Sequence, residues 1–248
     1  MTVVVSYGGG TNSCAMLVGL HERGERPDHI LFADTGGEKP HTYDHLLTMQ
    51  DWCASVGFPP ITTVRKESMT LEQECLARNA LPSIAYGFKS CSDHYKFRPQ
   101  KKFMRDNGIV PTLMCIGFDA DEPQRAKRGQ EIKDAWAKRY PLIEWGWGRD
   151  ECVDAIARAG LPQPGKSACF FCPSSKKQEI LELKRVYPQL AARAVAMENN
   201  AMENLTKVKG LGRSFAWRDL LAFDAAQISL LSDSPIDIAC DCYDGEAP

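Results

Sequence analysis

The apolar residues of this chain fall into short continuous runs that alternate with stretches of helix-like spacing. Four runs of apolar and β-branched residues predict strands, at Thr2–Ser6, His29–Ala33, Ile61–Val64 and Thr112–Ile116. Polar residues follow each run, and after them the apolar residues recur three and four positions apart. This alternation predicts an α/β fold of Rossmann-like kind, with a parallel twisted sheet and helices on both faces.

Turn and cap residues indicate where the first two helices begin and end. Asn12 is placed to cap the first helix, and Pro40 suits the first position of the second. Gly57 is placed to end that second helix.

A change in composition divides the chain after about 160 residues. Pro162–Ser174 is rich in proline, glycine and serine and predicts a loop, after which Lys176–Met197 returns to helical spacing. We therefore expect a nucleotide-binding α/β domain over residues 1–160. Residues 161–248 are expected to form a cysteine-containing loop, a small helical region and a tail, packed on that domain.

The carboxyl ends of the predicted strands collect the polar loops. Gly8–Ser13, Asp34–Glu38 and Gly117–Arg128 each follow a predicted strand. In open parallel sheets, ligands bind in the crevice beyond these ends. The three loops are therefore expected to share one rim that carries a binding site.

Composition and charge narrow the function classes. The 248 residues have a formal net charge of -2 and a pI near 6.2, so a nucleic-acid partner would need a local basic site. No basic segment precedes the first strand and no apolar stretch is long enough to span a bilayer, so we expect a cytoplasmic protein without a membrane partner. The ten cysteines are too sparse for a disulfide-bonded secreted domain, which favours metal or catalytic roles for the clustered ones.

A glycine-rich loop joins the first predicted strand to the first predicted helix. Such a loop suits a phosphate group, because its glycines let the backbone approach the ligand closely and its hydroxyls and free helix-start amides can donate hydrogen bonds. The residues that supply them are Ser6, Gly8, Gly9, Gly10, Thr11, Asn12 and Ser13. The loop has neither the lysine of a Walker A motif nor the G-x-G-x-x-G spacing of dinucleotide-binding folds. Taken alone, a glycine turn without a ligand is an equally good interpretation.

Gly8–Ser13 resembles the S-G-G-x-D-S loop of the PP-loop ATP pyrophosphatases, a superfamily that includes the phosphoadenylyl-sulfate reductases. Gly8 stands where that motif has serine, and Asn12 where it has aspartate. The resemblance implies a fold of the adenine nucleotide alpha-hydrolase type that binds ATP or a related adenine nucleotide with Mg²⁺. It also implies that this loop, with Ser6 nearby, holds the nucleotide and that Ser13 takes part in catalysis.

A second segment, Phe32–Pro40, resembles the D-T-G-x-E motif of the same superfamily. The resemblance implies that Asp34, Thr35 and Gly36 contact the nucleotide and that Asp34 and Glu38 are catalytic. Carboxylates at a sheet rim suit a magnesium ion, a ribose or an attacking group. A buried strand-to-helix turn is the alternative interpretation.

Cys91–Pro99 resembles the C-T-x-x-x-K-x-x-P segment of the branch that contains the sulfur-inserting enzymes of DNA phosphorothioation. We expect Cys91 and Lys96 to share one helix face, and the resemblance implies that Lys96 is catalytic. The segment lies in the most basic stretch of the chain, which suits the phosphates of a substrate or of a nucleic acid. A solvated basic helix is the alternative for the lysines and arginines beyond it.

A fourth segment, Ile116–Arg125, resembles the G-x-R-x-x-E pattern of the superfamily, with Asp119 in place of its arginine. Gly117 is expected to contact the nucleotide. Arg125 is expected to clamp a transferring phosphate or sulfate, with a surface ion pair as the alternative. The resemblance extends from Val3 to about Pro173.

The cysteines divide into clustered and isolated ones. Cys169 and Cys172 form a C-x-x-C pair, a spacing that lets two thiolates bind one iron or zinc ion. The resemblance implies that Cys91 is a further ligand, and Cys240 or Cys242 in the acidic tail could be the fourth. We expect a [4Fe-4S] cluster, with zinc on the same ligands and a redox-active pair as alternatives. The isolated cysteines are expected in the core: Cys14, Cys53, Cys75, Cys115 and Cys152.

Together these motifs favour an enzyme that cleaves ATP to AMP and pyrophosphate and so activates an acceptor for sulfur transfer. The acceptor could be a nucleic acid or a small molecule, and a sulfur donor protein is a possible partner. A sulfonucleotide reductase that attacks with Cys240 or Cys242 is one alternative. A non-catalytic nucleotide-binding or iron-sulfur partner protein is another, motivated by Gly8, Asn12 and Asp119.

Overall fold

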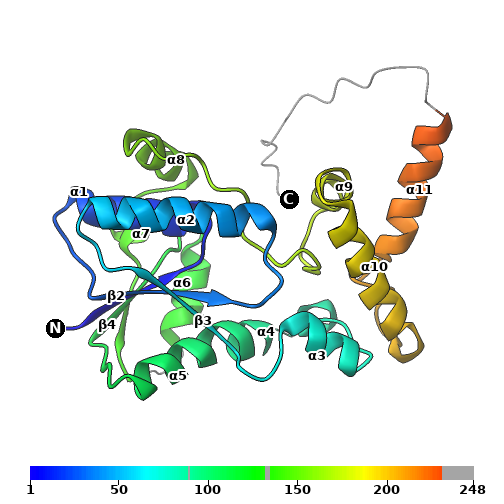
Figure 1. The fold of residues 1–248 in the computed structure, drawn as a ribbon, viewed down its shortest axis with the longest axis horizontal. Helices are drawn as coiled ribbons and strands as arrows, with labels where there is room; N and C mark the ends of the chain where they lie inside the picture. Colours follow the sequence, from blue (N-terminus) through cyan, green and yellow to red (C-terminus); the bar gives the residue numbers. More distant parts are fainter. Residues whose placement is uncertain (89, 132–134, 231–248) are drawn as a thin grey trace.

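The computed structural model describes residues 1–88, 90–131 and 135–230, and its centre is a five-stranded parallel sheet (Figure 1). The strands lie in the order β3-β2-β1-β4-β5, and every neighbouring pair is parallel. Their bounds are β1 Val3–Tyr7, β2 His29–Asp34, β3 Ile61–Arg65, β4 Leu113–Ile116 and β5 Ala137–Arg139. The predicted α/β class is confirmed. β5 was not predicted, because Ala-Lys-Arg contains no apolar run.

Helices cover both faces of the sheet because successive strand residues point to opposite sides. Val5 and Tyr7 share a core with residues of α1 (Thr11–Glu22), α2 (Pro40–Ser55), α7 (Pro141–Glu144) and α8 (Arg149–Arg158). Their neighbour Val4 faces the other side, where it shares a core with Met104 of α5 (Arg98–Asp106). Figure 1 shows α1 and α2 on one side of the sheet and α5 on the other.

The first helix begins differently from the prediction. Gly10, in extended conformation, is the residue that precedes α1, so Asn12 is not its cap. The side chain of Asn12 instead donates to Asp119. The second helix agrees with the prediction: Pro40 is its first residue, and Gly57, with a φ of 74°, follows its last turn.

The segment with Cys91 and Lys96 is a helix of changing pitch. It runs from α4 (Ser90–Ser92) through a π-helical turn, η2 (Asp93–Phe97), into α5. In a π-turn the backbone bonds join residues five apart, so positions 91 and 96 are about one turn apart. Cys91 packs against the second core, whereas Lys96 lines the cavity, so their common helix face stays a prediction.

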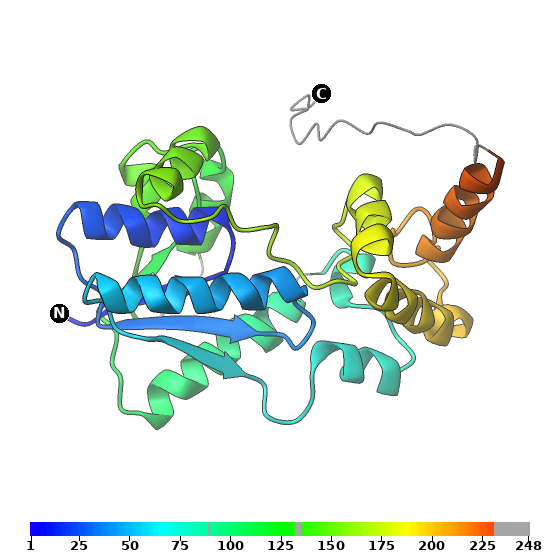
Figure 2. The same cartoon turned by 45° about the horizontal axis from the view of Figure 1, so that its top comes forward.

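A second core lies beside the sheet, where α9 (Lys177–Val186), α10 (Pro188–Ala201) and α11 (Trp217–Leu230) pack together (Figure 2). Residues from α3 (Leu71–Ala77) and Tyr95 of η2 belong to the same core. Lys176–Met197, predicted as one helical stretch, forms two helices. The remaining short elements are η1 Ser83–Tyr86, α6 Pro123–Glu131 and η3 Met202–Asn204. No helix within the described ranges has both the length and the apolarity needed to cross a membrane.

One buried carboxylate organises the second core. Glu198 of α10 is fully buried. Its Oε2 accepts hydrogen bonds from the amides of Leu211 (2.7 Å) and Trp217 (2.9 Å), and Oε1 accepts one from Arg218 (3.1 Å). The carboxylate therefore fixes the loop before α11 and satisfies the amides at the start of that helix.

We expect Glu198→Gln to destabilise the protein by about 1–3 kcal/mol, because an amide nitrogen would replace one of two accepting oxygens and face backbone donors. Urea unfolding measures the loss. Glu203→Gln is the matched control, since Glu203 is exposed on η3. Equal midpoints for the two variants would contradict this role of Glu198.

Candidate functional site

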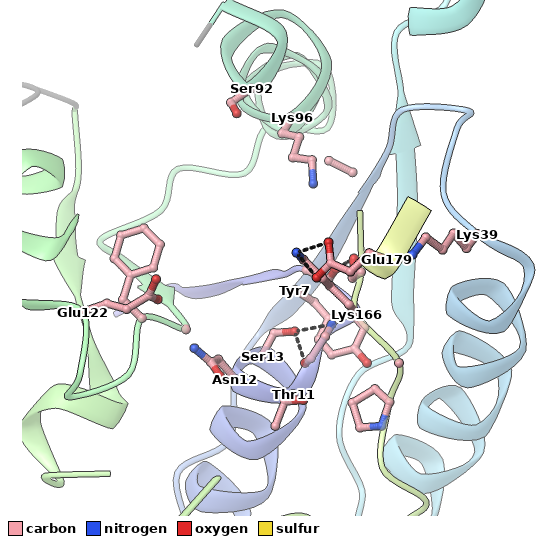
Figure 3. A pocket seen from close by; sticks show the side chains of 18 of the residues that line it. Tyr7, Thr11, Asn12, Ser13, Lys39, Ser92, Lys96, Glu122, Lys166 and Glu179 are labelled. Carbon is pink, nitrogen blue, oxygen red and sulfur yellow. Dashed lines mark hydrogen bonds and ion pairs between the residues drawn. The ribbon is translucent and has the colours of Figure 1, made fainter. Parts of the chain in front are cut away.

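A large cavity, of about 2820 Å³, opens at the carboxyl ends of β1 and β4. The strand order reverses between these two strands, because β2 and β3 follow on one side of β1 and β5 lies beyond β4. Such a switch point is where open α/β sheets bind ligands. Many of the predicted site residues line this cavity: Ser6, Gly8, Gly10, Thr11, Asn12, Ser13, Lys96, Gly117 and Arg125. Figure 3 shows Thr11, Asn12 and Ser13 at the start of α1 and Lys96 entering from the helix opposite.

The glycine loop is held in shape by its own hydroxyl. Ser13 Oγ donates to the carbonyl of Gly10 at 2.9 Å and lies 3.2 Å from the Gly10 amide, which donates to it. Gly9 has a φ of 74°, and a Cβ there would come within 3.0 Å of Thr42. The loop therefore requires a glycine at position 9, and it presents the amino end of α1 to the cavity.

β4 approaches the start of α1 at Gly117. A Cβ at this position would lie 3.1 Å from the backbone nitrogen and Cα of Ser13. A side chain would push the two loops apart. Gly117 thus makes one continuous wall from the glycine loop and the loop after β4.

The Asp34–Glu38 loop lies at the same rim, but its predicted site residues do not line the cavity. Asp34 is buried, and both its oxygens are engaged: Oδ1 accepts from the Gly36 amide (2.7 Å) and Tyr43 (2.9 Å), and Oδ2 accepts from Arg65 (2.8 Å). Asp34 therefore holds its own loop together in this structure. The predicted roles of Asp34, Thr35 and Gly36 in nucleotide binding stay predictions.

Glu38 is buried next to the cavity wall. Its Oε1 has no hydrogen-bond partner among the described residues and lies 3.7 Å from Lys96 Nζ. Burial raises the pKa of the Glu38 carboxyl, and the Lys96 ammonium counteracts part of that rise. Lys96 thus connects the cavity, which it lines, to the buried carboxylate behind the wall.

The segment that leads into and contains the C-x-x-C pair contacts both the glycine loop and the Asp34–Glu38 loop directly. Ser167 Oγ donates to the Gly8 carbonyl at 2.6 Å and lies 3.3 Å from Glu38 Oε2. Cys169 and Glu38 form an antiparallel bridge, and the Phe170 amide donates to the Gly37 carbonyl at 2.8 Å. We call residues 165–172 the strap. Sequence reasoning missed Ser167 because its partners lie more than a hundred residues earlier in the chain.

Two of the predicted metal ligands, Cys169 and Cys172, belong to the strap, and a third, Cys91, lies near Cys172. Cys91, Cys169 and Cys172 are each partly buried, and both Cys91 and Cys169 pack against the second core. Burial raises the pKa of Cys172, and the nearby Cys91 raises it further. Burial also raises the pKa of Cys169 to about 12. Within the described ranges no three side chains of His, Cys, Asp or Glu are close enough to form a ready metal site. Cys240 and Cys242 lie outside the described residues.

The isolated cysteines are buried, as predicted. Desolvation raises their thiol pKa values to about 11 or 12, so they stay protonated at neutral pH. These residues are Cys14, Cys53, Cys75, Cys115 and Cys152.

Two further cavity residues escaped the sequence analysis. Gln100 is buried, and its Nε2 donates to Ser6 Oγ at 3.1 Å. Arg149, the first residue of α8, reaches Asn12 Oδ1 at 3.4 Å. Neither residue belongs to a motif. Altogether eleven lysines and arginines line the cavity against six carboxylates, although the whole chain is slightly acidic.

Arg125 forms the ion pair that was its alternative interpretation. Its NH1 lies 2.6 Å from both carboxylate oxygens of Glu122, and its guanidinium stacks over the Phe118 ring. The pair is at the cavity surface, so a clamping role for Arg125 stays a prediction.

Comparison with solved structures supports the fold. The U34-tRNA thiolase NcsA from Methanococcus maripaludis, solved with its [4Fe-4S] cluster, superposes with a TM-score of 0.51 at 15% identity, over 98% of this chain and 76% of that one. A phosphoadenylyl-sulfate reductase from Candida auris, in a phosphate complex, gives a TM-score of 0.48 at 15% identity, over 68% of this chain and 81% of that one. No family model and no curated protein matches the sequence. The chain shares the α/β fold of NcsA, as its motifs predicted.

We expect Gly37→Ala to loosen the strap, because the added Cβ would lie 2.6 Å from the ring of the fully buried Phe171. Overpacking of this kind costs about 1–3 kcal/mol and should lower the melting temperature. In Gly8→Ala, the control, the new Cβ meets nothing closer than 3.6 Å. If Gly37→Ala melts no lower than Gly8→Ala, the strap is not tightly packed on this loop.

Proposed function

We propose that this protein is an ATP-using enzyme that adenylates an acceptor, releases pyrophosphate, and transfers sulfur with the help of an iron-sulfur cluster. The observation that carries this proposal is the strap. It joins the carbonyl of Gly8 in the glycine loop to the Cys169–Cys172 pair through Ser167 and the Glu38 bridge. A nucleotide on the loop and sulfur chemistry at the cysteines would then share one site.

The nucleotide half of the proposal rests on the start of α1. The helix N-terminus and glycine loop favour negative charge, and Ser13 holds the loop open to the cavity. An acceptor oxygen would attack the α-phosphate, pyrophosphate would leave, and sulfur would then displace AMP from the adenylated acceptor. Lys96 lines the cavity and is placed to stabilise charge that develops on the phosphates.

Mg²⁺ is expected to accompany the nucleotide, since this ion is usually held by one or two carboxylates together with substrate phosphates. Both oxygens of Asp34 already accept hydrogen bonds, so its use as a magnesium ligand needs a rearrangement of its loop. Phosphate oxygens are therefore the main expected ligands.

The sulfur half rests on Cys91, Cys169 and Cys172. Thiolates are the ligands that iron-sulfur clusters prefer, and Cys91 and Cys169 pack against the apolar second core. Both features suit an iron-sulfur cluster. The three residues would hold the cluster, and a tail cysteine is the expected fourth ligand. When bound, the cluster would hold sulfur or order the site. The structure of NcsA, solved with its [4Fe-4S] cluster, supports this assignment.

The size and charge of the cavity suit a second, anionic substrate. Pockets for small ligands measure roughly 300–1,000 Å³, so this cavity has room for a nucleotide and an acceptor together. The excess of basic side chains on its walls favours an acceptor that carries phosphate, such as a nucleic acid. A sulfur donor protein would supply the sulfur.

We expect protein purified without oxygen to contain iron and acid-labile sulfide at cluster stoichiometry, with the matching visible absorption. Cys169→Ser should abolish both, because it removes one thiolate ligand. Cys53→Ala, a change in the sheet core, should retain them. Stoichiometric zinc, or no metal, in the wild-type protein would overturn the cluster assignment.

We expect Ser13→Ala to weaken ATP binding by about tenfold, because it removes both hydrogen bonds that shape the glycine loop. Equilibrium binding of ATP measures this loss, and pyrophosphate release measures turnover. The control is Ser55→Ala, whose hydroxyl bonds only within α2. A wild-type protein that binds no adenine nucleotide contradicts the proposal. Binding of ATP without pyrophosphate release from any acceptor favours the non-catalytic alternative.

A further inference from the structure

A buried carboxylate stands where the glycine loop meets the loop after β4. Asp119 lies two residues after Gly117, lines the cavity, and is 5% exposed. Its Oδ2 accepts a hydrogen bond from Asn12 Nδ2 at 2.8 Å. Its Oδ1 is buried and has no hydrogen-bond partner among the described residues. An unpaired buried acceptor costs free energy, which a donor on a ligand would recover.

The orientation of Asn12 is fixed from both sides. Its Nδ2 faces the Asp119 carboxylate, and its Oδ1 lies 3.4 Å from Arg149 NH1. The reverse orientation would place an oxygen against a carboxylate and an amide group against a guanidinium. Asn12 therefore holds Asp119 in a defined position relative to the glycine loop.

The position of Asp119 matches the sugar of a nucleotide whose phosphates lie at the start of α1. Gly117 brings β4 so close to Ser13 that a Cβ would be 3.1 Å from its backbone nitrogen. The ribose, which is next to the phosphates in a nucleotide, would therefore face the loop after β4. This loop and the glycine loop form the switch-point crevice, in which nucleotides bind across open α/β sheets.

A comparison of the two buried aspartates at the sheet rim singles out Asp119. Asp34, at the end of β2, already accepts three hydrogen bonds from Gly36, Tyr43 and Arg65. It has little capacity left for a ligand. Asp119 lines the cavity, and one of its oxygens has no hydrogen-bond partner among the described residues.

The surroundings of Asp119 disfavour a second anion. Asp121 and Glu122 lie close enough to raise the pKa of its carboxyl, although burial is the larger cause. The charge of Arg125 is already paired with Glu122, and the guanidinium of Arg149 contacts Asn12 Oδ1. The Asp119 carboxylate can accept a hydrogen bond from a neutral hydroxyl, whereas its negative charge repels a phosphate.

We propose that Asp119 determines nucleotide specificity: it accepts a hydrogen bond from a ribose hydroxyl and excludes nucleotides that carry a phosphate on the ribose. The inference rests on the proposed function, since it requires an adenine nucleotide on the glycine loop. The Asp119 carboxylate would favour binding of ATP, whose ribose hydroxyls are free, over binding of adenylyl compounds that carry a 3′-phosphate. Asn12 is a positioning residue for this contact.

The first test uses the wild-type protein and changes only the ligand. We expect equilibrium binding to weaken by about tenfold or more when 2′-deoxy-ATP or 3′-deoxy-ATP replaces ATP, for at least one of the two. We also expect adenosine 3′,5′-bisphosphate to bind more weakly than AMP by at least about tenfold. Equal affinities within both comparisons overturn the inference while leaving the proposed function intact. If ATP itself does not bind, the proposed function fails first.

The second test changes the residue. Asp119→Ala should remove the difference between ATP and the deoxy analogue, and Asp119→Asn should reduce the penalty for the 3′-phosphate by removing the charge. Asp93→Asn is the control, because it neutralises a cavity carboxylate of η2 that pairs with Arg98. Circular dichroism verifies that each variant is folded. Folded Asp119 variants that discriminate as the wild type does contradict the inference.

Discussion

The attachment of the strap to the glycine loop and the Asp34–Glu38 loop is the interaction on which the site depends. Ser167, in a loop that follows all five strands, donates to the carbonyl of Gly8. Two residues later, Cys169 pairs its backbone with Glu38. These short polar contacts set the distance between the glycine loop and the C-x-x-C pair. Without them, the cysteines and the glycine loop would belong to separate parts of the molecule.

Local sequence signals predicted most of the sheet and half of the site. The strands β1 to β4 are continuous apolar runs, and such runs are typical of strands that are buried on both faces. The glycine loop was visible because positions such as Gly9 need a backbone conformation that few other residues adopt. Pro40 and Gly57 marked the ends of α2 for equally local reasons.

Contacts between distant segments account for what the sequence did not show. Asn12 looked like a helix cap, but a carboxylate 107 positions later competes for its amide group. Asp34 looked like a ligand for metal or sugar, but Arg65 and Tyr43 occupy its oxygens. Tyr43 and Arg65 belong to no motif, and Asp119 lies in a different motif from Asn12, so no local pattern along the chain could have indicated these pairs. Positions 12 and 119 are far apart in the sequence, and the fold brings them together as one hydrogen-bonded pair.

The composition of the second core has a consequence for biosynthesis. Its residues come from Leu71–Tyr95 and from Phe170–Leu221, on both sides of the last strands of the sheet. During translation, Leu71, Cys75 and Tyr95 leave the ribosome long before their packing partners exist. The apolar surface that they form must stay uncovered until α10 and the start of α11 have been made. The nascent chain therefore passes through a stage in which the sheet is complete but the apolar surface beside it is still exposed to solvent. Chaperones bind exposed apolar surface, so we expect them to bind at this stage.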